Sequence, residues 1–326
     1  MYFSLFLSLF LIPFVCVAQM QEDPHFQIGS KFERSFHTNL EDIPQAFQKA
    51  ALSVAQFGSS TAFYVGRHEG KDIMATAAHS ALSRAKNYTH DLTYYQENSK
   101  VLCRIFVNSE DSPLRDFQFN LLDTVFECKS LVAIYPELDL AFFELVPKDT
   151  FDLSPYGIEF SSTESFSKGS PLYSLSYSGF KNTGYISFDL GFTKGPLCSS
   201  FVGSNEIDYL ESYDDLTQES LYVPSFPIGC DASPGDSGAP LLNQNGSLVG
   251  MLWSVSNSKN QYVPNEDHLK GLLQKTVPYS SKELNFVWLN LNYSLSLEKS
   301  IQSIKKETES CNTVACKVLK SLISTK

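Results

Sequence analysis

The feature that most limits the fold of this chain is a repeated pattern of short apolar runs separated by turn residues. From about residue 51 onward, runs of four to eight residues such as TAFYV, DIMATAA and SLVGMLW alternate with Gly, Asn, Asp and Pro. Strands of this length with turn signals between them are typical of an all-β sandwich or barrel. The polar link at 66–72 and the pair Asn245-Gly246 each predict a hairpin turn between two strands.

The two ends of the chain depart from this pattern. Residues 19–50 are polar and mixed, so we expect an N-terminal arm or a pro-segment there. Residues 285–291, NFVWLNL, predict a last strand. Beyond it, apolar residues recur at a spacing that predicts a C-terminal helix with a break near residue 311; they are Leu297, Ile301, Ile304, Val318 and Leu322.

The first residues, MYFSLFLSLFLIPFVCVAQMQ, form an apolar segment that ends at a small residue. Apolar residues run from Tyr2 to Val17, and Ala18 fits the cleavage position of a secretory signal. A membrane anchor is the alternative, although the run is short for crossing a bilayer. We therefore expect a signal peptide at 1–18 and a secreted or periplasmic protein, with no membrane association once the signal is removed.

Cysteine usage fits this expectation. Removal of residues 1–18 leaves an even number of cysteines, which in a secreted chain indicates up to three disulfides among fifteen pairings. Sequence order favours the pairs 103–128, 198–230 and 311–316, and buried free thiols are the alternative. The six residues are Cys103, Cys128, Cys198, Cys230, Cys311 and Cys316.

Charge and composition exclude some classes of partner. The formal net charge is −11, which argues against a protein that binds nucleic acid. The Cys and His spacings do not match a zinc site. The sequence implies no metal ion and no organic cofactor.

Three residues in separate parts of the chain carry the chemistry. Ser237 lies between two glycines in GDSG, His79 ends the small-residue run MATAAH, and Asp139 interrupts the apolar run ELDLAFFEL. A buried carboxylate is costly unless it is paired. A serine hydroxyl becomes nucleophilic only with a base in hydrogen-bond reach, and that base needs an acid to orient it. Alone, His79 fits a strand cap and Asp139 is ambiguous; together the three fit a reactive serine.

Taken in the order His, Asp, Ser, the motifs TAAH, D-L-A and GDSGAP resemble those of the chymotrypsin-like (trypsin-like) serine peptidases. The run SLVGMLW after the serine, and FVWLNL followed by a helix, resemble later strands and the chain end of that family. The resemblance covers about residues 51–305 and leaves a helical tail at 306–326. It implies an all-β fold of two six-stranded antiparallel β-barrels with the active site between them.

The resemblance also implies a role for each residue. Ser237 would attack a peptide carbonyl, His79 would take and return the proton, and Asp139 would orient His79. The backbone N–H groups of Gly235 and Ser237 would form the oxyanion hole. We therefore expect a serine endopeptidase that acts on protein or peptide substrates as a monomer.

The chain also differs from animal trypsins. Ser80 and Ser233 stand where those enzymes have cysteines, which is closer to bacterial trypsin-like and glutamyl-endopeptidase relatives. The sequence Ile-Val-Gly-Gly, whose freed amine pairs in the family with the acid before the serine (here Asp236), is absent. Activation by cleavage, and the removal of residues 19–50, therefore stay open.

The specificity pocket is less defined. Asp231 lies six residues before Ser237, where trypsins carry the acid that binds Lys or Arg, although glutamyl-endopeptidase relatives often have Asp there without that preference. Leu252 replaces the His that those relatives use to recognise Glu. With Trp253 and Ser254 at the pocket edge, we expect cleavage after Lys or Arg.

Two other classes of function remain as alternatives. A catalytically silent protein of the same fold could bind a protein or glycan in the cleft, but it would not need all three residues. An esterase of the α/β-hydrolase type would need the order Ser, Asp, His and a G-x-S-x-G elbow, and the sequence has neither.

Overall fold

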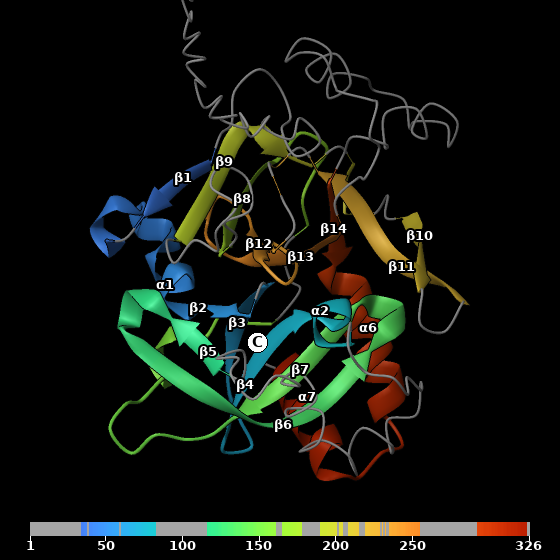
Figure 1. Cartoon of the computed structure of the whole chain (residues 1–326). Helices are drawn as coiled ribbons and strands as arrows, with labels where there is room; N and C mark the ends of the chain where they lie inside the picture. The colour runs from blue at the N-terminus through green and yellow to red at the C-terminus, as the bar shows by residue number, and fades with distance from the viewer. Residues whose placement is uncertain are drawn as a thin grey trace, which may run out of the picture.

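The computed structural model describes residues 34–37, 39–58, 60–82, 116–160, 165–177, 190–200, 202–204, 208–214, 219–228, 230, 232, 235–254 and 292–324. The strands in these residues form two antiparallel sheets, drawn one above the other in Figure 1. The expected signal peptide at 1–18, residues 19–33 of the expected arm and the predicted strand at 285–291 lie outside the described residues.

The first sheet is a closed six-stranded barrel with the order β2-β3-β4-β7-β6-β5. Its interior is rich in phenylalanine; the Phe57 and Phe117 rings are stacked with their centroids 4.6 Å apart. The strands are β2 (Val54–Phe57), β3 (Ser60–His68), β4 (Lys71–Ala77), β5 (Asp116–Phe119), β6 (Thr124–Tyr135) and β7 (Leu140–Leu145). This barrel confirms one of the two that the sequence predicted.

The second sheet differs from the prediction of a closed six-stranded barrel. It has eight strands in the order β1-β9-β8-β12-β13-β14-β11-β10. Six of them, from β9 to β11, curl until their ends meet at one isolated bridge between Ser200 and Ile228, and β1 and β10 lie outside this ring. The strands are β1 (Arg34–His37), β8 (Pro171–Ser176), β9 (Leu190–Ser199), β10 (Asp208–Asp214), β11 (Glu219–Ile228), β12 (Pro240–Leu242), β13 (Leu248–Ser254) and β14 (Asn292–Ser296).

Disulfides form where the sequence order favoured them. Cys198 pairs with Cys230 beside the Ser200–Ile228 bridge, inside the core of the second sheet. Cys311 pairs with Cys316 between the two C-terminal helices. Cys128 is also disulfide-bonded, and its expected partner Cys103 lies outside the described residues.

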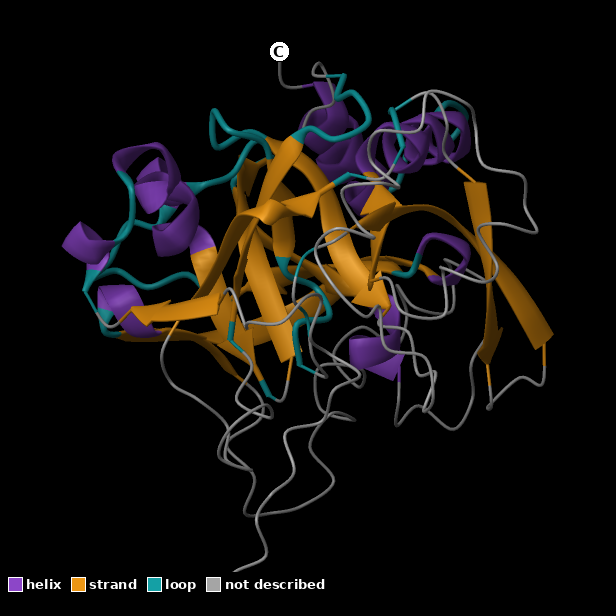
Figure 2. Cartoon of the chain, turned by 90° about the horizontal axis from the view of Figure 1, so that it is seen from above, coloured by secondary structure: helices purple, strands orange, loops and turns teal. Residues whose placement is uncertain are grey.

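Helices cover the flanks of the two sheets (Figures 1 and 2). The helix α1 packs Phe47 against Tyr173 of β8 and Phe192 of β9, with ring centroids 4.3 Å and 5.2 Å away. The helix α6 contacts β13 and β14, and α7 contacts β3 and β6, so the predicted C-terminal helix is two helices that touch both sheets. The helices are η2 (Leu40–Asp42), α1 (Gln45–Ser53), α2 (Ala78–Leu82), η3 (Asn120–Leu122), η4 (Pro136–Leu138), η5 (Ser154–Tyr156), α6 (Leu297–Thr308) and α7 (Val314–Ser324).

Both predicted hairpin turns are confirmed. The link at 66–72 turns from β3 to β4 through Glu69 and Gly70, and Gly246 turns between β12 and β13 with a φ of 79°. Among the residues that the structure describes, none of the helices has the length and apolar character needed to cross a membrane.

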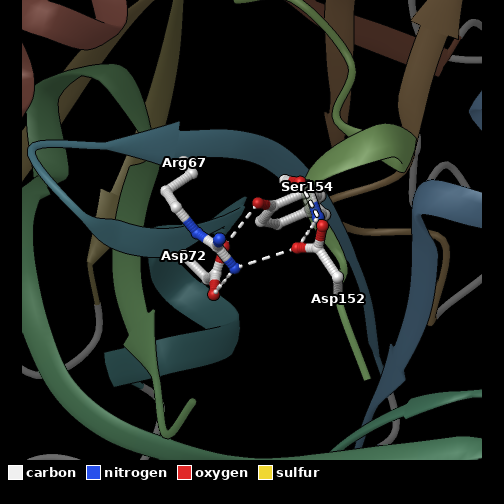
Figure 3. Close-up of polar contacts among 5 residues, drawn as sticks. Arg67, Asp72, Asp152 and Ser154 are labelled. Carbon is white, nitrogen blue, oxygen red and sulfur yellow. Dashed lines mark hydrogen bonds and ion pairs between the residues drawn. The ribbon is translucent and has the colours of Figure 1, made fainter. Parts of the chain in front are cut away.

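A polar cluster fastens the β3–β4 hairpin to the segment that leaves the first barrel (Figure 3). Arg67 donates two hydrogen bonds to the carboxylate of Asp72, at 3.0 and 2.9 Å, and also pairs with Asp152 at 3.2 Å. Asp152 in turn accepts hydrogen bonds from the backbone N–H and the hydroxyl of Ser154. Arg67 and Asp152 are exposed, so the ion pair between them contributes little to stability.

Candidate functional site

His79 lies where β4 passes into the short helix α2. The alanines before it, Ala75, Ala77 and Ala78, are fully buried and allow the chain to pack closely behind the imidazole. The side chain of His79 is 50% exposed, so it stands at the surface between the two sheets with a buried backbone behind it.

Asp139 is held in an unusual backbone conformation that aims its carboxylate at His79. It caps η4 with a φ of 46°, a left-handed value that Asp tolerates better than most residues. Its N–H donates to the Pro136 carbonyl at 2.9 Å, and its own carbonyl accepts from the N–H of Ala78 at 3.0 Å. The bond to Ala78 places the start of η4–β7 directly beside the end of β4.

The carboxylate of Asp139 makes two hydrogen bonds to His79. Its Oδ1 accepts from the backbone N–H of His79 at 2.7 Å, and its Oδ2 lies 2.7 Å from the ring nitrogen Nδ1. The Asp139 side chain is only 8% exposed, so this partner offsets the cost of burying the charge.

Ser237 completes a continuous chain of three side chains. Its Oγ lies 2.9 Å from Nε2 of His79, on the opposite side of the ring from Asp139. An ionised carboxylate can only accept, so Nδ1 carries a proton and Nε2 of the neutral ring accepts from the serine hydroxyl. The arrangement can therefore move the serine proton to the imidazole.

The charge of Asp139 sets the proton affinity of His79. Desolvation of the ring by the residues around it acts to lower the pKa of His79, but the negative charge of Asp139 and its hydrogen bond outweigh this and raise the pKa above its ordinary value. A raised pKa makes the imidazole a stronger base towards the serine hydroxyl.

The turn that carries Ser237 is packed without spare room. Gly235 and Gly238 have φ values of 103° and 88°, which disfavour any residue with a side chain. A Cβ on Gly238 would come within 2.1 Å of the Thr61 carbonyl oxygen and 2.4 Å of the Thr76 hydroxyl. The N–H of Gly238 donates to the Leu252 carbonyl at 2.8 Å, and the intervening Asp236 is 1% exposed. The turn is thus pressed against both sheets.

The residues predicted for the specificity pocket are described only in part. Asp231 lies outside the described residues, and for Ser254 only the backbone at the end of β13 is described. The side chain of Trp253 lies in the core shared by the two sheets, and its indole N–H donates to the hydroxyl of Ser225 at 2.9 Å. At this position the backbone, rather than the indole, is the part available to line a pocket.

One residue of the site was missed by sequence reasoning. Thr61, at the start of β3, donates from its backbone N–H to the Ser237 carbonyl at 3.0 Å and from its hydroxyl to the Gly235 carbonyl at 3.1 Å. The stretch GSSTAFYV identified the strand, but no local signal marked a contact with residues about 175 positions later. In the described part of the chain, no group of three or more His, Cys, Asp or Glu residues is arranged to hold a metal ion.

The comparisons with known proteins agree with this geometry. The family profile described as "Trypsin-like peptidase domain" matches residues 60–251, a span that includes His79, Asp139 and Ser237. No curated protein sequence matches the chain.

Several solved structures are similar to the chain. The inactive form of the Rv3671c protease of M. tuberculosis has 16% identity and a TM-score of 0.46, and the match covers 80% of this chain and 92% of that one. The active form has 18% identity, a TM-score of 0.39 and coverages of 71% and 86%. The HtrA-type protease AlgW with a decapeptide has 10% identity, a TM-score of 0.38 and coverages of 77% and 52%. With TM-scores below 0.5, these similarities support no inference about the function of the chain.

Proposed function

Because the chain belongs to the trypsin-like peptidase family, we propose that it is a serine endopeptidase in which Ser237 is the nucleophile, His79 the general base and acid, and Asp139 the residue that orients His79. The observation that carries this proposal is the unbroken line of hydrogen bonds from Ser237 Oγ through both nitrogens of His79 to the carboxylate of Asp139.

The proposed reaction is consistent with the positions of these atoms. As Oγ of Ser237 bonds to the peptide carbonyl carbon, its proton passes to Nε2 of His79, and the carbonyl oxygen becomes an oxyanion. Collapse of this intermediate breaks the C–N bond, and His79 gives the proton to the departing amine. Water then attacks the acyl-enzyme with His79 as base and releases the acid and Ser237.

The oxyanion needs donors that are already in place. The backbone N–H groups of Gly235 and Ser237 are the proposed pair, since both lie in the turn that carries the nucleophile. Loss of one such donor costs about 10²–10³ in rate in related chemistry.

The substrates proposed are proteins or peptides, cut after Lys or Arg. The support for this preference is Asp231, six residues before Ser237, together with Leu252 in place of a histidine that would favour Glu. Trp253 and Ser254 would contribute through the backbone at the C-terminal end of β13.

We also propose that the protein is secreted or periplasmic. The support is the leader pattern at 1–18 together with two disulfides and a fifth bonded cysteine, Cys128, because such bonds persist in oxidising compartments.

Labelling with a fluorophosphonate probe tests the proposal directly. The probe reacts with an activated serine, so wild-type protein should be labelled and Ser237→Ala should not. A peptide-library digest with the same two proteins then gives the cleavage preference. Folded wild-type protein that neither reacts nor cuts would point instead to a catalytically silent binding protein of the same fold.

A further inference from the structure

Thr61 is a buried residue of the first barrel whose backbone N–H and hydroxyl form hydrogen bonds with the turn that carries Ser237 and with Tyr177. It is 0% exposed and lies at the start of β3. Its N–H donates to the Ser237 carbonyl at 3.0 Å. Its hydroxyl donates to the Gly235 carbonyl at 3.1 Å and accepts from the N–H of Tyr177 at 3.0 Å, so both hydrogen-bonding roles of the hydroxyl are filled.

The position of Thr61 is itself fixed from behind. Its carbonyl accepts from the hydroxyl of Thr76 on β4 at 2.7 Å, and β3 is paired with β2 and β4 along its length. Thr61 therefore gives the turn a rigid support that belongs to the closed barrel rather than to the sheet that carries Ser237.

These bonds fix successive peptide planes of the turn. A trans peptide plane holds the carbonyl of one residue and the N–H of the next in opposite directions. The plane after Gly235 is held by the hydroxyl of Thr61, and the plane after Asp236 by the bond from the N–H of Ala239 at 2.8 Å. The plane after Ser237 is held by the N–H of Thr61. The N–H of Ser237 lies in the plane after Asp236, so Thr61 acts on it by holding the planes on either side.

The hydroxyl makes a contribution that the backbone of residue 61 cannot replace. Any residue except proline could supply the N–H to Ser237 from position 61, but a short side-chain hydroxyl, as in Ser or Thr, is needed to donate to Gly235 while accepting from Tyr177. We propose that the hydroxyl of Thr61 is a positioning group for the oxyanion hole: it holds the peptide plane between Gly235 and Asp236, and this plane joins the two planes that carry the N–H groups of Gly235 and Ser237. This inference rests on the proposed function of the same site.

Thr61→Val tests the inference because valine has nearly the same shape and lacks the hydroxyl. We expect kcat to fall by about 10- to 100-fold, less than the ~10²–10³ for losing an oxyanion donor itself, with KM nearly unchanged. Affinity for a peptide boronic acid, which forms a tetrahedral adduct on Ser237, should fall by a similar factor. Thr61→Ser should retain most of the wild-type kcat.

Thr308→Val is the matched control for the loss of a buried threonine hydroxyl. Thr308 is 3% exposed, and its hydroxyl donates within α6 to the Ile304 carbonyl at 2.8 Å, away from the turn. This variant should keep the wild-type kcat and boronic acid affinity. All variants are assayed well below their melting temperatures, and folding is checked by circular dichroism. If Thr61→Val does not fold, the pair Thr61→Ser and Thr61→Ala isolates the hydroxyl in the same way.

The outcomes separate this inference from the proposed function. Loss of kcat and of boronic acid affinity in Thr61→Val, with retention in Thr61→Ser and Thr308→Val, supports the positioning role. Wild-type kinetics in folded Thr61→Val, or an equal loss in Thr61→Ser, overturns it. Absence of turnover that depends on Ser237 in the wild-type protein overturns the proposed function first.

Discussion

The two sheets of this protein are built from similar strands but are stabilised in different ways. The first barrel is closed by continuous strand pairing and filled with aromatic side chains. The ring of strands in the second closes at one bridge, with the Cys198–Cys230 disulfide beside it, and takes further support from α1, α6 and Thr61.

The proposed base and its orienting acid lie in the closed barrel, whereas the proposed nucleophile lies in the second sheet. His79 and Asp139 come from adjacent ends of β4 and η4–β7 in the closed barrel, so their mutual geometry is set within one unit. Ser237 lies on a turn of the second sheet, and its distance to His79 depends on how that turn docks on the first barrel. The acid–base pair is thus preorganised locally, whereas the nucleophile is positioned by contacts between the two sheets.

The largest expected effect concerns the pair within the first barrel. Asp139→Asn removes the charge and the acceptor that hold Nδ1–H, and we expect kcat to fall by about 10⁴-fold at neutral pH with a folded protein. Hydrolysis of a fluorogenic peptide chosen from the library digest measures this. Asp72→Asn is the matched control: it alters another buried carboxylate of the same barrel, bonded to Arg67 and Tyr64, and should leave kcat unchanged.

The second prediction concerns the support of the second sheet by α1. Phe47 is 4% exposed and fills the space over Tyr173 and Phe192. Phe47→Ala should lower the free energy of unfolding by about 3–5 kcal/mol. Relative to wild type, native-state hydrogen exchange of this variant should accelerate more in β8 and β9 than in β4 and β7. Uniform acceleration across both sheets would remove the distinction between them.

The packing of α1 also bears on whether residues 19–50 are a removed pro-segment. Ile43, Phe47 and Ala50 are buried in the shared core, and β1 pairs with β9. A protein cut at residue 50 should therefore be much less stable than the full chain, as measured by thermal unfolding. Mature protein that begins at residue 51 with full stability would show that this arm is dispensable.

The third prediction compares the two described disulfides. In the chain-entropy account, a bond stabilises in proportion to the logarithm of the loop it closes. Cys198 and Cys230 are 32 residues apart, and Cys311 and Cys316 are 5 apart. Replacing both cysteines by serine should cost about 4 kcal/mol for the first pair and about 2 kcal/mol for the second. Chemical denaturation measures both, and a larger loss for the second pair would contradict the importance given to closure of the second sheet.

The fourth prediction concerns the docking of the turn. Gly238→Ala introduces a Cβ that overlaps the Thr61 carbonyl, so the turn must move and kcat should fall by about 10²-fold. Gly169→Ala is the control. Gly169 also has a left-handed φ, 81°, but no atom lies within 4 Å of the position that a Cβ would take. It should cost only the strain of that conformation, about 1–2 kcal/mol of stability, and leave kcat unchanged.

The smallest expected effect is a shift in pH dependence. His79 must be neutral to act as a base, so kcat/KM should rise with pH through the pKa of His79, which Asp139 raises above the ordinary value of about 6.5. In Asp139→Asn this rise should move to lower pH, because burial then acts without the opposing charge. A kcat/KM profile of each protein measures the shift, and an unchanged position would show that Asp139 does not set the pKa of His79.

The same pKa shift has a consequence for stability. The pKa of His79 is raised in the folded state. Its interaction with Asp139 therefore contributes fully to the free energy of unfolding below about pH 6.5, and this contribution is lost as the pH rises through the folded pKa. The wild-type protein should therefore lose this contribution to unfolding free energy across that range, and Asp139→Asn should not.

Local sequence patterns were enough to predict the strands β3, β4 and β13 and the hairpins at 66–72 and 245–246. The patterns are apolar runs and Gly at turns; Asp139, which was expected inside an apolar strand, lies between η4 and the start of β7. The three residues that meet at the site were identified by the resemblance of TAAH, D-L-A and GDSGAP to the motifs of a known family, since His79 and Asp139 are ambiguous when taken alone. The pairing of Cys198 with Cys230 and of Cys311 with Cys316 also agreed with sequence order, because each pair is near in the chain.

The docking of the two sheets, by contrast, decides where Trp253 and Thr61 act. β3 is buried on both faces, with Tyr64 inside the first barrel and Phe63 in the core shared with the second sheet, so its sequence shows no alternation that would tell one face from the other. The sequence around Trp253 likewise does not show that its indole points into that shared core. Thr61 contacts Gly235 and Ser237 across more than 170 residues of chain, and contacts of that kind depend on how two sheets dock, which no local pattern encodes.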